Sequence, residues 1–326
     1  MHNSITDVQG IRVGHASNFD GYTGCTVLLF DKGAVCGIDV RGSASGTRQV
    51  DALNIGHIVE QVHAVLLCGG SSFGLDAATG VVRYLEKQGI GFDVGPVRIP
   101  IVPAAVIFDL LFGDPMVRPT ADMGYEACVN AGVEVEEGSV GAGTGATLGK
   151  LFEGPRAMKG GLGTSSVIMP DGLIVGALVV VNAFGDIIDN VKGRIIAGAR
   201  ASAESSEFVN TATALQKGYT KKQFGLVNTT LGVVATNGRF SKRDITKVAQ
   251  MSQAGLVKTI SPVHTTFDGD LVFAVSAGEM EADVNRVGVL ADFVLAEAVK
   301  RAVKKADGFG IIPAFKDLGH GSKGGR

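Results

Sequence analysis

The sequence predicts a layered α/β sandwich of the α+β kind, in which helices cover β-sheets. Short apolar runs rich in β-branched residues cluster along the chain, and long helical patterns follow them in blocks. The two patterns do not alternate in a strict βαβ rhythm, which argues against a doubly wound sheet. Hydrophobic residues make up 45% of the 326 residues, enough for a large core, so we expect one domain over residues 1–326.

Six runs, each closed by Gly or Asp, are predicted to be strands. Several of them are apolar throughout, which is typical of strands that are buried on both faces of a sheet. The predicted strands are residues 26–30, 34–40, 64–70, 173–182, 231–237 and 271–278.

Three stretches are predicted to be helices because their apolar residues recur at three- and four-residue spacings. They are residues 74–89, 241–260 and 277–306. Ser241 precedes Asp244 by three residues, a pattern that predicts a helix N-cap and resembles a capping box with Asp in the Glu role.

Two polar segments are predicted to lie outside the packed core. Residues 189–225 are rich in Ala, Ser and Lys and poor in strand signals, so we expect a surface linker. Residues 319–326 are rich in Gly, and we expect this tail to be disordered.

The charge pattern argues against nucleic acid and membrane as partners. The formal charge is −2, and no block of Lys and Arg is long enough to follow a phosphate backbone. Residues 173–181 form an apolar run far shorter than the ~20 residues that a membrane helix needs. Residues 1–15 have neither a basic nor an apolar region of the secretory kind, so we expect a cytoplasmic protein.

We expect neither a metal nor an organic cofactor. Residues 141–146 loosely fit a dinucleotide-binding loop, but Glu136 and Glu137 interrupt the strand that should precede it, and the expected acidic partner is missing. Leu151 stands where a phosphate-binding loop beginning near Lys150 would need Ser or Thr. The cysteines form no C-x-x-C pair and have no histidine at ligand spacing, so we expect four buried thiols: Cys25, Cys36, Cys68 and Cys128.

Ser72 offers one candidate nucleophile. Residues 70–74 fit the G-x-S-x-G pattern of serine hydrolases, after a predicted strand and before a predicted helix. A triad would then need His264 or His320, the only later histidines, and a lone His is more often structural. Otherwise the loop is a Gly-rich turn whose backbone N–H groups bind a ligand carboxylate.

Thr229 offers another candidate nucleophile, at the start of a predicted strand. Its hydroxyl would attack the Asn228 carbonyl to form an ester, and water would then separate two chains. The new α-amine has an ordinary pKa near 7.7–8.0, so it would serve as the base at neutral pH without any histidine. On the residues alone, an ordinary Thr-rich strand start explains the segment equally well.

Ten ordered motifs resemble the family of L-aminopeptidase D-amidase/D-esterases, peptidase family S58. This family includes β-peptidyl aminopeptidases and 6-aminohexanoate-oligomer hydrolases. The similar stretches cover nearly the whole chain: residues 5–15, 23–30, 39–48, 66–80, 99–110, 138–150, 158–166, 175–186, 228–237 and 262–278.

The resemblance implies a four-layer αββα sandwich similar to N-terminal-nucleophile hydrolases. It also implies self-cleavage between Asn228 and Thr229 into an α chain, residues 1–228, and a β chain, residues 229–326. Thr229 matches the family's nucleophile, and Asn182 matches the side chain that stabilises the oxyanion, a contribution of about 3 kcal/mol.

Four further residues match the family's site. Lys159 matches a lysine near the nucleophile, and Tyr125 matches an active-site tyrosine over a shorter stretch. Asp268 and Asp270 match a pair that would orient the Thr229 amine or bind a substrate ammonium. Strand alternation would place both carboxylates on one face, although a D-G-D turn also explains the pair.

The resemblance predicts a hydrolase that removes N-terminal residues from short peptides, amino-acid amides or esters, or ω-amino acid oligomers. It further implies a homotetramer of processed αβ units. Two alternatives stay open: an acyltransferase of the ornithine acetyltransferase type, which passes the acyl group to an amine, and a serine hydrolase that uses Ser72.

Overall fold

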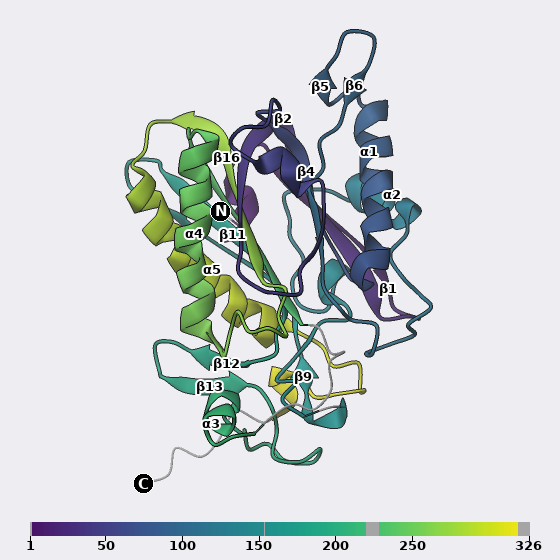
Figure 1. Cartoon of the computed structure of the whole chain (residues 1–326), viewed down its shortest axis with the longest axis vertical. Coiled ribbons are helices and arrows are strands. Elements are labelled where there is room, and N and C mark those ends of the chain that lie inside the picture. The colour runs from purple at the N-terminus through teal and green to yellow at the C-terminus, as the bar shows by residue number, and fades with distance from the viewer. Residues whose placement is uncertain (1, 153, 220–227, 319–326) are drawn as a thin grey trace.

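Four layers make up the protein, in the arrangement that the family resemblance implies. Figure 1 shows two helices on one side, two helices on the other, and two layers of strands between them. The helices are α4 (Lys242–Thr259) and α5 (Val284–Lys305), opposite α1 (Ala77–Lys87) and α2 (Ala121–Val129). This computed structural model describes residues 2–152, 154–219 and 228–318. The predicted αββα sandwich is therefore confirmed.

One long strand, β2 (Thr23–Val40), belongs to both sheet layers. Its first half pairs with β1 and β4, and its second half pairs with β16. The sequence predicts two strands here, but Gly33, at φ +73°, allows an irregularity in the register that bends the strand without ending it.

The strand order is β10-β11-β14-β16-β2-β4-β7-β3, with β1 also paired to β2. The pairs β14–β16 and β4–β7 are parallel, and the other neighbours in this order are antiparallel. The remaining strands are β1 (Ile11–Asn18), β3 (Gly46–Arg48), β4 (Val62–Cys68), β7 (Ala104–Val106), β10 (Gly161–Ile168), β11 (Ile174–Asn182), β14 (Thr229–Gly238) and β16 (Leu271–Met280).

Alternating side chains divide the core into layers. In β2, Leu28 and Phe30 pack into the cluster between the two sheets, whereas Val27 and Leu29 pack with residues of α1 and α2. A third cluster joins the β11–β14–β16 sheet to α4 and α5. Both faces of the central strands are therefore buried, which explains their continuous apolar runs.

The helices begin at polar caps. The Ser241 side chain accepts a hydrogen bond from Asp244 N, which confirms the predicted N-cap of α4. Asp283 caps α5 in the same way, so this helix begins later than predicted and β16 continues to Met280. The first predicted helix begins as a 3-10 turn, η3 (Ser71–Asp76), before α1.

The prediction of a surface linker at residues 189–225 is wrong where the segment forms regular structure. It contains β13 (Arg194–Ala197) and α3 (Thr211–Gln216). Buried Asp186, just before the segment, accepts hydrogen bonds from Thr211 N at 2.7 Å and Ala199 N at 2.9 Å, and this carboxylate fixes the polar chain. Residues 220–225 and the predicted disordered tail, 319–326, lie outside the described residues.

Short elements complete the described chain: η1 (Ile5–Asp7), η2 (Val50–Leu53), β5 (Phe92–Asp93), β6 (Arg98–Ile99), η4 (Gly141–Gly143), β8 (Thr147–Leu148), η5 (Gly154–Arg156), β9 (Met158–Lys159), β12 (Asp186–Asp189), β15 (Ile260–Ser261) and η6 (Phe315–Leu318).

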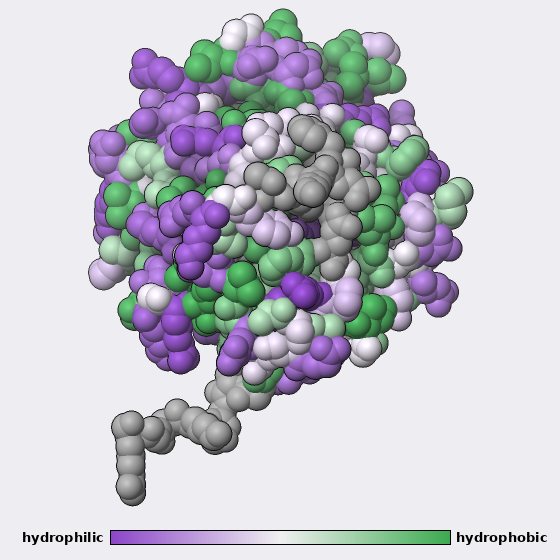
Figure 2. Space-filling model, turned by 60° about the horizontal axis from the view of Figure 1, so that its bottom comes forward, coloured by the Kyte–Doolittle hydropathy of each residue, from purple (hydrophilic) through white to green (hydrophobic). Residues whose placement is uncertain are grey.

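All four cysteines are buried free thiols, as predicted. Within the described ranges, no helix combines the length and apolar character needed to cross a bilayer. Hydrophilic and hydrophobic residues intermix on the face shown in Figure 2.

Candidate active site at the Asn228–Thr229 junction

Thr229 begins β14 and lies opposite Asn182, the last residue of β11. Its hydroxyl donates a hydrogen bond to the Asn228 carbonyl oxygen at 2.5 Å. The same oxygen accepts a second hydrogen bond from Gly269 N at 2.7 Å. Only 2% of Thr229 is exposed. A candidate nucleophile and a polarised carbonyl group therefore meet in a site shielded from water.

Asp268 and Asp270 hold the chain around this junction. Asp270 accepts hydrogen bonds from Thr230 N at 2.6 Å and from His264 N at 3.0 Å. Asp268 accepts one from Phe184 N at 3.2 Å, just beyond β11. Both aspartates precede β16, so an irregular segment places them rather than strand alternation. The pair that the sequence singles out lies next to the candidate nucleophile.

Burial makes both carboxyl groups weaker acids. It raises the pKa of Asp270 to about 8, and the nearby charge of Asp268 contributes in the same direction. Burial also raises the pKa of Asp268, although hydrogen bonds from Thr265 and the charge of Lys150 oppose that shift. The pair is therefore prepared to accept a cation or a proton near neutral pH.

Hydrogen bonds fix the orientation of the Asn182 amide. Its Oδ1 accepts from Thr147 N at 3.0 Å and from Lys150 Nζ at 2.6 Å. Its Nδ2 donates one hydrogen to the Phe108 carbonyl at 3.1 Å. An amide nitrogen carries two hydrogens, so the second N–H has the character needed to stabilise an oxyanion.

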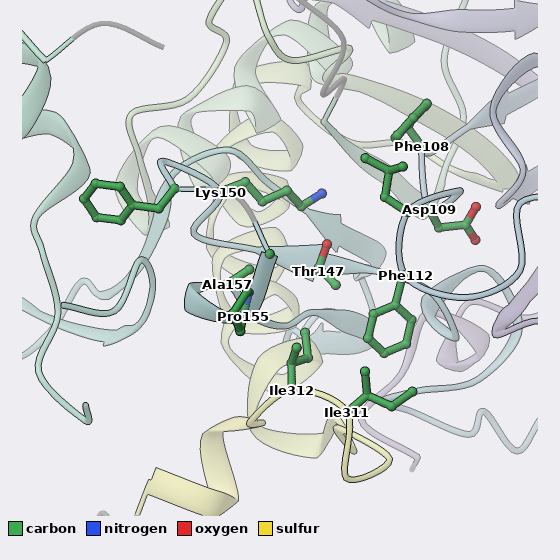
Figure 3. A pocket seen from close by; sticks show the side chains of 12 residues that line it. Phe108, Asp109, Phe112, Thr147, Lys150, Pro155, Ala157, Ile311 and Ile312 are labelled. Carbon is green, nitrogen blue, oxygen red and sulfur yellow. The ribbon is translucent and has the colours of Figure 1, made fainter. Parts of the chain in front are cut away.

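A pocket of about 550 Å³ adjoins the Asn182 contacts. Lys150, Thr147 and Phe108 belong to its lining, and all three hydrogen-bond with Asn182. Figure 3 shows Ile311 and Ile312 facing the same space from a segment that follows α5. The full lining is Phe108, Asp109, Leu111, Phe112, Thr147, Lys150, Phe152, Gly154, Pro155, Ala157, Ile311 and Ile312.

A family model described as peptidase family S58 matches residues 3–309. The chain belongs to this family. An uncharacterized aminopeptidase of Mycobacterium leprae is 40% identical, with 99% of this chain and 96% of the relative aligned. A 6-aminohexanoate-oligomer endohydrolase of a Kocuria species is 30% identical, with 91% of this chain and 85% of the relative aligned.

Solved structures support the fold of this S58 peptidase. The L-aminopeptidase D-Ala-esterase/amidase of Ochrobactrum anthropi, described as a variant of the Ntn hydrolase fold, superposes with a TM-score of 0.70 at 20% identity. A β-aminopeptidase of a Burkholderia species gives 0.66, also at 20% identity. Each comparison covers 94% of this chain and 87% of the other. The family match and the named relatives identify the chain as a hydrolase of peptide or amide bonds.

Lys159 lies apart from the junction in this S58 peptidase. Its ammonium donates to the backbone oxygens of Gly143, Ala146 and Gly160 at 2.8 to 3.1 Å. Complete burial lowers the pKa of Lys159 to about 7. Its link to Asn182 is indirect, because Lys159 pairs with Thr147 in the β8–β9 ladder.

Lys150 is the lysine that contacts Asn182. In the sequence it stands out only as part of a pattern that does not fit a phosphate-binding loop. The only signal was its place in the G-A-T-L-G-K stretch that ends one of the family-like motifs. The sequence spacing does not show whether Lys150 or Lys159 contacts Asn182. The answer depends on how the chain folds back between β8 and β9, which pair antiparallel.

The structure places Tyr125 in the outer helical layer. On α2, its ring packs edge-on against Tyr84 of α1, with Arg83 and Lys87 over its face. Among the described residues, no hydrogen bond or ring contact joins Tyr125 to Asn182 or Thr229.

Ser72 lies in η3, whereas the ring of His264 contacts α4. The His264 Nε2 atom lies 3.1 Å from Gln253 Oε1 on α4. The backbone N–H of His264 donates a hydrogen bond to the Asp270 carboxylate. His264 therefore has structural contacts in the S58 peptidase, and His320 lies outside the described residues.

Proposed function

We propose that this S58 peptidase cuts its own chain between Asn228 and Thr229 and then works as an N-terminal-threonine amidohydrolase. The observation that carries the proposal is the contact at the junction. The Thr229 hydroxyl lies 2.5 Å from the Asn228 carbonyl oxygen, which also receives the Gly269 N–H. One domain thus yields an α chain, residues 1–228, and a β chain, residues 229–326.

Self-cleavage begins when Thr229 Oγ1 attacks the Asn228 carbonyl carbon. The Gly269 N–H stabilises the negative charge that develops on the carbonyl oxygen. The C–N bond then breaks, the hydroxyl proton reaches the Thr229 nitrogen, and an ester joins Asn228 to Thr229 Oγ1. Water hydrolyses this ester and leaves a carboxyl group on Asn228 and a free α-amine and hydroxyl on Thr229.

Turnover repeats this chemistry on a substrate. The α-amine of Thr229 takes the proton of its own hydroxyl as Oγ1 attacks the substrate carbonyl, and it passes that proton to the leaving amine when the C–N bond breaks. Water then hydrolyses the resulting acyl-enzyme ester, which releases the acid product and restores the Thr229 hydroxyl. Asn182 donates its second N–H to the oxyanion, and Lys150 keeps the amide oriented. Asp268 and Asp270 orient the α-amine or bind a substrate ammonium. The mechanism uses neither a metal nor an organic cofactor.

The substrates are short peptides, amino-acid amides or esters, or ω-amino acid oligomers that present an N-terminal residue. The named relatives, aminopeptidases and an oligomer endohydrolase, support this range. The proposal includes a cytoplasmic homotetramer of processed units that binds neither nucleic acid nor membrane, as the family resemblance and the charge pattern suggest.

Denaturing mass spectrometry tests the proposal. We expect two fragments with ends at Asn228 and Thr229, and hydrolysis of aminoacyl p-nitroanilides by the cut protein. Thr229→Ala should abolish both. Thr236→Ala is a matched control, because Thr236 is also buried on β14, and its hydroxyl donates to Ile174 O and accepts from Gly238 N at the other end of the strand. An intact chain whose Thr229→Ala variant keeps full activity would refute the mechanism.

A further inference from the structure

We infer that the pocket beside Asn182 accepts an uncharged, apolar side chain of the acylated residue and excludes an ammonium group. This inference rests on the proposed function, because it names the substrate class of that same site. It distinguishes among the substrate types that the family resemblance leaves open.

The walls of the pocket are mostly hydrocarbon. Its apolar members come from three segments of the chain: Phe108, Leu111, Phe112, Phe152, Pro155, Ala157, Ile311 and Ile312. About 550 Å³ of space accommodates a side chain as large as a butyl or aromatic group. Leu111 and Ile311 remain 68% and 47% exposed, so apolar surface is available for a ligand to cover.

The charges around the pocket disfavour a cation. Lys150 places an ammonium in the lining, where it bonds to Asn182 Oδ1. A second ammonium, that of Lys159, lies behind the wall, 5.5 Å from the centre of the Phe112 ring. A ligand ammonium would lose its hydration and meet the like charge of Lys150.

Asp109 is the one acidic residue among the described residues of the lining, and its carboxylate is already engaged by other groups. Asp109 accepts hydrogen bonds from Gly70 N at 2.6 Å and Thr23 Oγ1 at 2.7 Å. Figure 3 shows its carboxylate directed away from the other labelled side chains. Only 5% of Asp109 is exposed, so it offers little to a ligand amine.

The position of the pocket assigns it to the acyl side of the substrate. Three of its lining residues hold Asn182, the side chain that stabilises the oxyanion in the proposed reaction. A side chain on the acylated residue would therefore extend into this space, whereas the Asp268 and Asp270 pair meets the amine at the junction.

Norleucyl and lysyl p-nitroanilides test the inference, because they share a leaving group and differ mainly in a terminal ammonium. We expect kcat/KM for the norleucyl compound to exceed that for the lysyl compound at least about tenfold. Equal rates, or faster lysyl hydrolysis, would overturn the inference.

Ile312→Asp places a carboxylate in the apolar wall and should lower the norleucyl-to-lysyl ratio at least about tenfold. Ile58→Asp is the matched control, since Ile58 is 81% exposed and outside the lining, and it should leave the ratio unchanged. Cleavage into two chains would show that Ile312→Asp still folds. A ratio that Ile312→Asp does not move would also overturn the inference.

Binding to the Thr229→Ala variant separates this inference from the proposed function. Titration calorimetry should show tighter binding of norleucinamide than of lysinamide even though that variant does not turn over. If Thr229→Ala retained activity, the proposed function would fail while the pocket preference was still measured. If turnover required Thr229 but lysinamide bound better, only the pocket inference would fail.

Discussion

The cleavage junction and the pocket beside Asn182 are built in different ways. At the junction, Thr229 and the Asp268–Asp270 pair lie at the starts of two neighbouring parallel strands, and backbone N–H groups meet carboxylates and a carbonyl. Around Asn182, the partners come from the two-residue strand β8 and from loops, and Lys150 reaches the amide with a long side chain. The first region is fixed by backbone register, whereas the second depends on individual side chains.

This difference predicts how each region responds to substitution. A change at the junction that moves the backbone should stop chemistry almost completely, because the attacking oxygen and the carbonyl must keep their geometry. A single change around Asn182 should reduce turnover only partly, because several contacts together orient the amide.

The largest expected effect comes from Gly269→Ala. A Cβ at this position would lie 2.8 Å from Thr229 Oγ1 and 2.6 Å from the Ala44 carbonyl oxygen. One of these groups must shift, and we expect self-cleavage to slow by about a hundredfold. Quenched time courses on denaturing gels measure the rate.

Gly132→Ala is the control for this experiment, because an added Cβ there meets nothing within 4 Å. Its cleavage rate should equal that of the unchanged protein. Normal cleavage in Gly269→Ala would mean that the junction tolerates displacement and that the two regions do not differ as described.

The next effect concerns the two buried lysines. Lys150→Met removes one donor to Asn182 Oδ1 but leaves Thr147 N, so we expect kcat and kcat/KM to fall together by about tenfold. Stopped assays with a single p-nitroanilide measure both constants.

Lys159→Met serves as the comparison, because the Lys159 ammonium hydrogen-bonds to three backbone oxygens and not to Asn182 among the described residues. It should lower the free energy of unfolding by about 1–3 kcal/mol with kcat nearly unchanged. A larger loss of kcat in Lys159→Met than in Lys150→Met would reverse the assignment of the two lysines.

The sequence predicts the junction better than the pocket for a physical reason. Residues 228–237 and 262–278 are a buried strand and the approach to its parallel neighbour, and their apolar patterns alone suggest these strands. The contact between Lys150 and Asn182 depends on how the loop after β8 folds, which no periodicity encodes. The same limit explains why Asp186 and its bonds to the segment around Thr211 were missed.

A smaller effect should appear in the pH dependence of stability in the uncut Thr229→Ala variant. The pKa of Asp270 is raised to about 8 from an ordinary value of 3.8, so folding binds a proton between these values. The contribution of Asp270 to the free energy of unfolding is therefore fully present below about pH 4 and is lost as the pH rises toward 8. We expect urea denaturation to show lower stability at pH 8 than at pH 5.

Asp270→Asn in the same variant isolates this contribution. Asp186, whose pKa burial raises to about 6, adds a slope of the same sign in both proteins, so the difference between them reports Asp270. The slope should flatten in Asp270→Asn. An unchanged slope would show that the carboxyl group at the junction is already ionised in the uncut chain.

The smallest effect tests whether the two regions are insulated from the outer helices. Ser241 caps α4 through Asp244 N, and hydrogen bonds link α4 to the junction through Gln253 and His264. Ser241→Ala should cost about 1 kcal/mol of stability, measured by urea denaturation. Self-cleavage and kcat should stay within about twofold, because a frayed first turn lies far along the helix from Gln253. A matching loss of activity would mean that the register of β14 and β16 depends on α4 as a whole, and the junction would then be no more robust than the loops around Asn182.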